Sequence, residues 1–189
     1  DVYKRQVIKS VTAVGPYLNF FFDEVMLARN VLKEIWKNKK MFGWKKRGKG
    51  TVVIEFPSPN TNKPLHLGHL RNMAIGECVS RLLESQGYRV IRTNLNNDRG
   101  IHICKSMLAY KKWGKNKRPD KKPDHFVGDF YVMYNKKLSE NPGIEEEAKE
   151  LLRKWESGDP ETMRLWKTMN SWALAGFNQT YKRFGVKFD

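Results

Sequence analysis

Residues 51–70 read TVVIEFPSPNTNKPLHLGHL, and the rest of the predicted fold is arranged around this stretch. It starts with an apolar, largely β-branched run, which is typical of a strand in a parallel sheet covered on both faces. Three prolines then restrict a loop, and the stretch ends where a helix is predicted to begin. We therefore expect a buried strand, a stiff loop and a helix start in direct succession.

A helix and a second strand follow this stretch. The helix is predicted from apolar residues that recur every three or four positions and is stopped by Gly87; these are Leu70, Ala74, Ile75, Cys78, Val79, Leu82 and Leu83. Residues 88–94, YRVIRTN, predict the strand. Residues 51–94 would then form a right-handed βαβ unit of a Rossmann-type α/β fold. Ligands of such sheets bind at the carboxyl ends of the strands, here at residues 55–69 and 95–100.

The residues before this unit predict a strand, a helix and a basic loop. In residues 11–23, VTAVGPYLNFFFD, a Gly-Pro turn precedes a strongly apolar strand that needs something to pack against. We interpret residues 1–23 as the end of an N-terminal domain whose beginning is missing. Residues 24–50 are interpreted as a linking helix followed by a loop rich in lysine and aromatic residues. That loop suits contact with a phosphate backbone, and a merely solvated linker is the alternative.

The residues after residue 100 are predicted to be mostly helical. Apolar periodicity predicts helices near residues 101–113, 126–138, 144–155 and 160–184, separated by polar or glycine-containing turns. The last helix carries Trp and Met residues at helical spacing, which we interpret as packing and not as a cofactor site. We divide the chain into half of a Rossmann-type domain at 51–114 and a mostly helical insertion at 115–189.

Composition restricts the class of protein. Apolar residues make up 40% of the chain and aromatic residues 12%, too many for a disordered chain. No apolar run approaches the roughly 20 residues of a membrane helix, and nothing resembles a signal peptide. The formal charge of +16 favours a polyanionic partner, with nucleic acid the first candidate and simple solubility the alternative. Cys78 and Cys104 fit neither a disulfide framework nor a metal knuckle, which favours the cytoplasm.

Polar residues at the end of the first strand predict a binding site. Glu55 would end a buried strand, where a carboxylate is costly unless it meets a cation. The cation could belong to a positively charged ligand, or to a basic side chain that forms a structural salt bridge with Glu55. Ser58 and Asn60 supply short polar groups that can bind an amine or a carboxylate, although both residue types also form turns.

The helix start predicts a phosphate site. His66, Gly68 and His69 lie where unpaired amides and the helix dipole favour an anion. Two imidazoles there can donate hydrogen bonds to an oxygen that gains negative charge, and Gly68 lets a ligand approach the backbone. Lys63 adds positive charge. A zinc pair is the alternative, without an evident third ligand.

The stretch also resembles a known family. Residues 55–72, EFPSPNTNKPLHLGHLRN, are similar to the strand, loop and HIGH signature of class I aminoacyl-tRNA synthetases, and the lead-in EFPSPN with Lys63-Pro64 looks specifically like the arginyl-tRNA synthetases. Residues 97–100 resemble the second conserved loop of that family, with Arg99 in the place of a tryptophan. GPYLNFFF looks like the end of its N-terminal tRNA-binding domain. The resemblance runs from about Val11 onward, whereas the first residues, DVYKRQ, do not share it.

The resemblance implies ATP-dependent activation of L-arginine and its transfer to tRNA(Arg), with Mg²⁺ accompanying the ATP. By matched position, Glu55 would face the guanidinium group, and Ser58 and Asn60 would hold the polar end of arginine. His66, Gly68 and His69 would bind ATP, and the catalytic group would comprise His66, His69 and Lys63. We expect a cytoplasmic protein without a resident metal, monomeric at full length, with residues 51–114 as the first half of the catalytic domain.

No KMSKS-like loop, second half of the nucleotide fold or helical anticodon-binding domain is found in the sequence. We therefore expect an inactive fragment of such an enzyme. Two other hypotheses stay open: another HIGH-type adenylyltransferase, such as a cysteinyl enzyme or a small-molecule ligase, and a non-catalytic RNA-binding module whose histidines are incidental.

Overall fold

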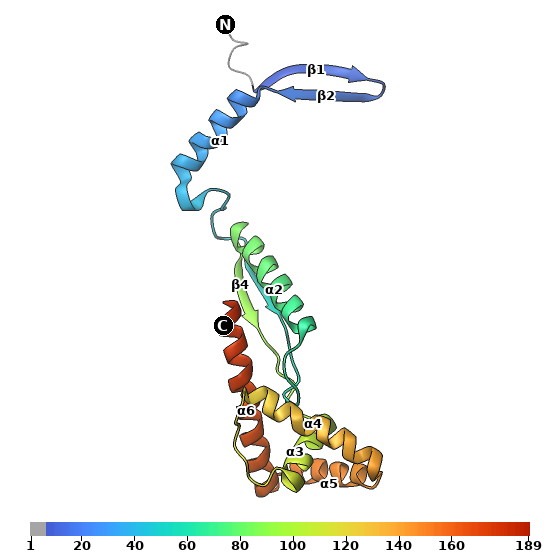
Figure 1. Cartoon of the computed structure of the whole chain (residues 1–189). Coiled ribbons are helices and arrows are strands. Elements are labelled where there is room, and N and C mark those ends of the chain that lie inside the picture. Colours follow the sequence, from blue (N-terminus) through green and yellow to red (C-terminus); the bar gives the residue numbers. More distant parts are fainter. Residues whose placement is uncertain (1–6) are drawn as a thin grey trace.

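The computed structural model describes residues 7–189, and Figure 1 shows an elongated arrangement of its elements. In chain order these are β1 (Ile8–Val14), β2 (Tyr17–Phe22), α1 (Glu24–Asn38), the short 3₁₀ helix η2 (Lys39–Met41), β3 (Thr51–Glu55), α2 (Leu67–Ser85), β4 (Arg89–Thr93), α3 (Ile101–Trp113), α4 (Pro123–Glu140), α5 (Ile144–Glu156) and α6 (Pro160–Phe184). The β1–β2 hairpin and α1 extend away from the rest, and α3–α6 gather at the opposite end (Figure 1). Within residues 7–189, no helix combines the length and the apolar character needed to cross a membrane.

The predicted βαβ unit is present. Strands β3 and β4 pair in parallel, with Thr51 opposite Arg89 and Glu55 opposite Thr93, and α2 forms the crossover between them. The expected coverage of both sheet faces is not found: alternate residues of β3 are exposed, and Val53 is 61% exposed. This prediction was wrong for the described residues because they form only a two-stranded parallel sheet, with one crossover helix beside it.

Helix α2 packs closely on the residue that follows β3. Phe56 is buried, and a Cβ atom added to Gly76 of α2 would lie 2.3 Å from its Cγ atom. Glycine at this position lets the helix axis approach the phenyl ring, since any larger side chain would occupy the same space. The contact fixes the start of the loop that carries the predicted site.

The N-terminal residues form an antiparallel hairpin instead of a packed strand. Strand β1 pairs with β2 along its length, and Gly15 adopts the left-handed φ of 57° in the predicted turn. The sequence predicted β2 and the turn but not β1. Neither strand contains a buried residue, and the interpretation of residues 1–23 as the end of an N-terminal domain stays a prediction. The expectation that the first residues, DVYKRQ, do not share the family resemblance concerns residues 1–6, which lie outside the described residues.

Helices α3–α6 share one hydrophobic core. Most of its fully buried side chains come from α3, α4 and α6, and the predicted Trp and Met stripe of α6 contributes Met169, Ala173, Phe177 and Tyr181. Helix α3 packs on α4 and α5, although it lies before residue 114, where the sequence predicts the end of the Rossmann-type half. That domain boundary stays a prediction.

The chain returns to the sheet after α6. The backbone N–H of Asp189 donates to the carbonyl oxygen of Arg92 at 3.0 Å, and the Arg92 N–H donates to Asp189 Oδ2 at 2.8 Å. Phe188 packs on Phe56, with ring centroids 5.4 Å apart. Both contacts attach the end of the helical segment to the edge of β4.

Candidate functional site

The loops after β3 and β4 are hydrogen-bonded to each other. The N–H of Asn97 donates to Pro59 O at 3.0 Å, and the N–H of Thr61 donates to Asn97 O at 3.1 Å. The side chains repeat this pairing, since Asn97 Nδ2 donates to Asn60 Oδ1 at 2.9 Å. The two polar loops predicted at the carboxyl ends of the strands therefore form one edge, and Asn60 lies in it.

Helices α3 and α4 contact the loop after β3. The first loop is buried at Thr61 and Asn62, and Ser106 Oγ of α3 donates to the carbonyl oxygen of Asn62 at 3.5 Å. Gly128 of α4 lies so close to Pro64 that an added Cβ atom would come within 2.5 Å of the proline Cδ. The loop is thus held between the sheet and the helical core.

Glu55 and Ser58 form a hydrogen-bonded pair at the start of this loop. Ser58 Oγ donates to Glu55 Oε1 at 2.7 Å. Glu55 is exposed, so the prediction that it ends a buried strand was wrong; the cause is the incomplete coverage of β3. Within residues 7–189 it forms no ion pair, and the structural salt bridge considered for it is not observed there. The carboxylate is therefore accessible to a cationic ligand and oriented by one hydroxyl.

Asn94 connects this pair to the last helix, a role that the sequence did not reveal. Its Oδ1 accepts from the N–H of Ser58 at 3.2 Å, and its Nδ2 donates to Tyr181 Oη at 3.1 Å. Ser58 has a positive φ of 51°, so an external hydrogen bond helps to hold its unusual backbone conformation. The available signal was position alone: Asn94 directly follows a predicted strand at its carboxyl end.

His66 and His69 cap the start of α2 reciprocally. The N–H of Gly68 donates to His66 Nδ1 at 3.1 Å, and the N–H of His66 donates to His69 Nδ1 at 3.1 Å. The imidazole rings are adjacent, with centroids 4.1 Å apart. Because each Nδ1 atom accepts, the neutral form of each ring carries its proton on Nε2. Both Nε2–H groups remain as donors for an external acceptor.

The neutral form of His69 is favoured. Partial burial lowers its pKa below the ordinary value of 6.5, and the nearby charges of His66 and Lys63 lower the pKa further. A positive charge on His69 is therefore disfavoured. Near neutral pH, His69 is an uncharged hydrogen-bond donor to an anion.

Gly68 gives His66 the space that it occupies. A Cβ atom at residue 68 would lie 2.9 Å from His66 Cε1 and 3.1 Å from its Nδ1. The small residue therefore keeps the imidazole over the first turn of α2. Lys63 is partly exposed in the preceding loop, and its charge acts on His69. These residues together make the helix start suitable for a phosphate group.

The second predicted loop is fixed by α5 and α6. The carbonyl oxygen of Asp98 accepts from Trp166 Nε1 at 2.8 Å, and its carboxylate accepts from Asn170 Nδ2 at 3.3 Å. Arg99 instead pairs with Glu156 at 3.2 Å and lies over the ring of Trp155. The residue that departs from the family pattern thus contacts α5, and Asp98 holds the loop on α6.

A metal site does not emerge from these contacts. Among residues 7–189, no three His, Cys, Asp or Glu side chains are grouped so that they could bind a metal ion. The donors at the start of α2 are N–H groups, which suit an anion and not a cation.

Comparisons with known proteins identify the family of the chain. A family model described as "tRNA synthetases class I (R), catalytic domain" matches residues 31–188. Proteins named "Arginine--tRNA ligase" from Treponema denticola and Borrelia hermsii are 52% and 50% identical to the chain, covering 94% and 100% of it. The matches span 31% and 34% of those relatives, so the chain corresponds to about a third of their length.

Solved structures show the same likeness. The arginyl-tRNA synthetase of Thermus thermophilus aligns with a TM-score of 0.66 at 26% identity, over 97% of this chain and 29% of the other. That of Plasmodium falciparum aligns with a TM-score of 0.68 at 18% identity, over 97% and 32%, and shows the shared fold alone. The matching family model and the two close relatives establish that the chain belongs to the catalytic-domain family of the class I tRNA synthetases for arginine.

Proposed function

We propose that this chain provides the arginine pocket and one side of the ATP site of an arginine–tRNA ligase. Such an enzyme activates L-arginine with ATP and transfers it to tRNA(Arg). The observation that supports this most directly is the reciprocal cap of His66 and His69, which leaves two Nε2–H donors at the start of α2. The proposal includes a cytoplasmic location and a monomer at full length.

The arginine subsite follows from the loop after β3. The exposed Glu55 carboxylate, oriented by Ser58 Oγ, would pair with the guanidinium group. Asn60 uses its Oδ1 atom to accept from Asn97, which leaves its Nδ2 group to donate to the polar end of the amino acid. Ser58 can still accept a hydrogen bond at Oγ. Charge and donor pattern therefore match arginine.

The proposed role of the helix start is to position and neutralise phosphate. The arginine carboxylate would attack the α-phosphate in line, with pyrophosphate leaving on the opposite side. The Nε2–H groups of His66 and His69 would donate to oxygens that gain negative charge, and Lys63 would add a positive charge. Mg²⁺, which would arrive on the ATP phosphates, would neutralise part of their charge.

Arginine-dependent exchange between ATP and pyrophosphate tests the proposal. The 189-residue chain would be compared with a protein in which it is joined to the remaining two thirds of the Treponema denticola relative. We expect exchange from the joined protein only. Changing both His66 and His69 to Ala should lower that exchange at least about 100-fold, whereas Glu55→Gln should mainly raise the KM for arginine.

The controls separate the alternatives. Robust exchange by the short chain would contradict its inactivity, and failure of a folded joined protein to use arginine would contradict the proposed substrate. If a folded joined protein bound tRNA but showed no exchange, and the histidine double variant bound tRNA equally well, the non-catalytic RNA-binding module would be the better description.

A further inference from the structure

The segment from α1 to β3 carries the least balanced charge of the described chain. Residues 29–49 contain one acidic residue, Glu34, and nine basic ones, which are Arg29, Lys33, Lys37, Lys39, Lys40, Lys45, Lys46, Arg47 and Lys49. We call these nine side chains the basic surface. All of them are exposed, and none is in an ion pair with another residue of the range 7–189.

The helical part of the chain differs in this respect. Between Arg99 and Arg153, nine basic side chains lie within 4.0 Å of a carboxylate; they are Arg99, Lys105, Lys111, Lys112, Lys121, Lys122, Lys137, Lys149 and Arg153. Much of the positive charge there is compensated internally. The charge of the basic surface is not, which leaves it available to an external polyanion.

The loop between η2 and β3, which carries four of these nine basic side chains, is attached to the sheet unit. The N–H of Lys45 donates to Ser85 O at 2.7 Å, and the N–H of Gly48 donates to Gly87 O at 3.2 Å. Lys49 Nζ lies 5.5 Å from the centre of the Tyr88 ring. The lysines are therefore presented from a fixed backbone, which distinguishes the loop from a free solvated linker.

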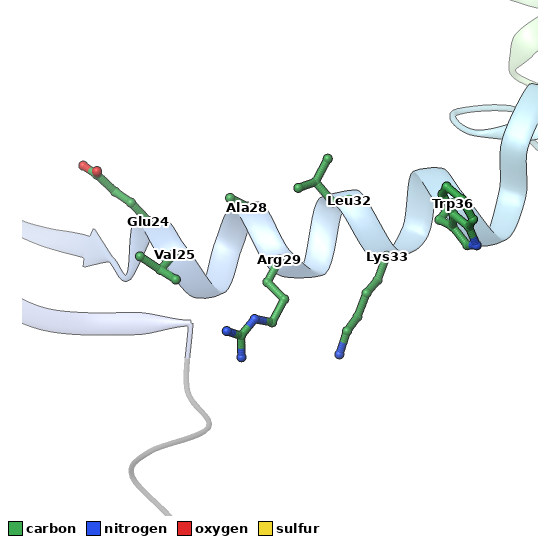
Figure 2. Close-up of a pocket in the computed structure, with 7 residues that line it drawn as sticks. All are labelled: Glu24, Val25, Ala28, Arg29, Leu32, Lys33 and Trp36. Carbon is green, nitrogen blue, oxygen red and sulfur yellow. The ribbon is translucent and has the colours of Figure 1, made fainter.

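Large aromatic side chains lie among the charges. Trp36 is 84% exposed, and Trp44 is 46% exposed. Figure 2 shows Trp36 at the end of the face of α1 from which Arg29 and Lys33 extend; together with Val25 and Leu32 they line a shallow hollow. Cations beside an exposed indole are the combination that binds a nucleic-acid backbone and stacks on a base.

The position of this surface separates it from the ATP site. The loop contacts the C-terminal end of α2, whereas His66 and His69 lie at the N-terminal end of the same helix. Helix α2 has 19 residues, which corresponds to about 28 Å at 1.5 Å per residue. One nucleotide cannot reach both ends, but a folded RNA can.

We propose that the basic surface binds the phosphodiester backbone of an RNA and that Trp36 stacks on one of its unpaired bases. The inference rests on the proposed function in taking that RNA to be tRNA(Arg). The cations neutralise phosphates and release counterions, and the indole adds a contact that requires an unpaired base. Lys45, Lys46 and Arg47 lie at the anchored part of the loop and are the backbone contacts with the most defined positions.

Binding of a transcribed tRNA(Arg) to the 189-residue protein tests this, with filter binding over a range of salt concentrations. The triple variant K45Q/K46Q/R47Q should bind at least about tenfold more weakly, and the slope of log affinity against log salt should fall by roughly 2 to 3. The matched control is K115Q/K117Q/R118Q, which removes the same charge from another exposed loop. It should change affinity less than about threefold.

Two further measurements make the test specific. Trp36→Ala should weaken tRNA binding roughly tenfold but leave binding to a blunt RNA duplex of about 20 base pairs unchanged, since the duplex offers no unpaired base. Equal losses from the two triple variants would show that binding follows net charge alone and would overturn the proposal. No effect of Trp36→Ala on tRNA would overturn the stacking contact.

The outcome is independent of the catalytic proposal. The RNA assay contains neither ATP nor arginine, so its result does not depend on catalysis. Loss of exchange with intact surface-dependent RNA binding would refute the ligase function and keep this inference. Normal exchange together with RNA binding that does not depend on the basic surface would keep the ligase function and refute this inference. Because every substituted side chain is exposed, far-UV circular dichroism should show that all variants keep the parent fold.

Discussion

Asn94 Nδ2 lies 3.1 Å from Tyr181 Oη, and this hydrogen bond joins the loop after β4 to the last helix of the chain. On its other side, Asn94 holds the N–H of Ser58 in the proposed arginine loop. One amide therefore ties the loop after β3 to α6. Burial raises the pKa of Tyr181, so its hydroxyl stays protonated and neutral over the ordinary pH range.

Asn94→Ala should destabilise the protein by about 1–3 kcal/mol, because two partly buried hydrogen bonds are lost. Tyr181→Phe removes only the bond to the phenol and should cost about 1 kcal/mol. Urea unfolding followed by tryptophan fluorescence measures both. Equal losses in the two variants would show that the bond to Ser58 contributes nothing.

Much of the backbone could be predicted from the sequence, because helix periodicity and parallel pairing depend on local patterns. Strand β4 falls within one residue of its predicted bounds, and α2 contains all the apolar positions predicted for it, from Leu70 to Leu83. Strand β1 was missed because its pattern, IKSVTAV, has few large apolar residues and is defined only by its partner. The exposure of Glu55 could not be predicted either, since it depends on what covers β3.

In the candidate site, too, residue types could be predicted from the sequence, whereas their contacts could not. The residue types at positions 66 to 69 predict an anion site at a helix start. Which imidazole nitrogen accepts and which donates follows only from the reciprocal cap, a relationship in three dimensions. Asn94 was missed for a similar reason: its role depends on Ser58 and Tyr181, which are 36 and 87 residues away.

His69 should titrate below 6.5, because burial and the charges of His66 and Lys63 lower its pKa. Lys63→Gln should raise the titration midpoint of His69 but leave it below 6.5, since burial is the largest cause of the lowered pKa. Histidine proton chemical shifts across pH 4–8 measure this, and Lys136→Gln is a control for a lysine elsewhere. A midpoint above 6.5 in the parent protein would contradict the arrangement.

The same shift makes stability depend on pH. Between the lowered folded pKa and the unfolded value of 6.5, the unfolded chain binds more protons, so stability rises with pH. The contribution of His69 is complete above about 6.5 and is lost as the pH falls through the folded pKa. His69→Gln keeps an acceptor at the third helical position and should flatten this part of the urea-midpoint profile. An unchanged profile would assign the dependence to other groups.

Gly68→Ala should disturb the site more than the fold. The new Cβ atom would lie 2.9 Å from His66 Cε1 and displace the imidazole, whereas alanine itself favours the helix. We expect a change in unfolding free energy within about 1 kcal/mol and at least tenfold less exchange in the joined protein described above. A large loss of stability would show that His66 is mainly structural.

Gly76→Ala should be strongly destabilising. Its Cβ atom would lie 2.3 Å from Cγ of the buried Phe56, and neither the helix nor the ring has space to move freely. Overpacking of this kind costs about 1–3 kcal/mol or more. Gly143→Ala is the matched control, because its Cβ atom meets only the exposed side chain of Asn141 at 3.2 Å. Similar urea midpoints for the two variants would contradict the packing of α2.

The return of Asp189 to Arg92 has a topological consequence. The segment from Asn94 to Phe188 leaves the sheet just after β4 and comes back to the same strand, so its two ends lie close together. A segment with adjacent ends can lengthen, shorten or be exchanged without separating the strands that it interrupts. The four helices therefore lie in a segment that leaves and rejoins the sheet at β4, so a change in its length need not separate β4 from β3.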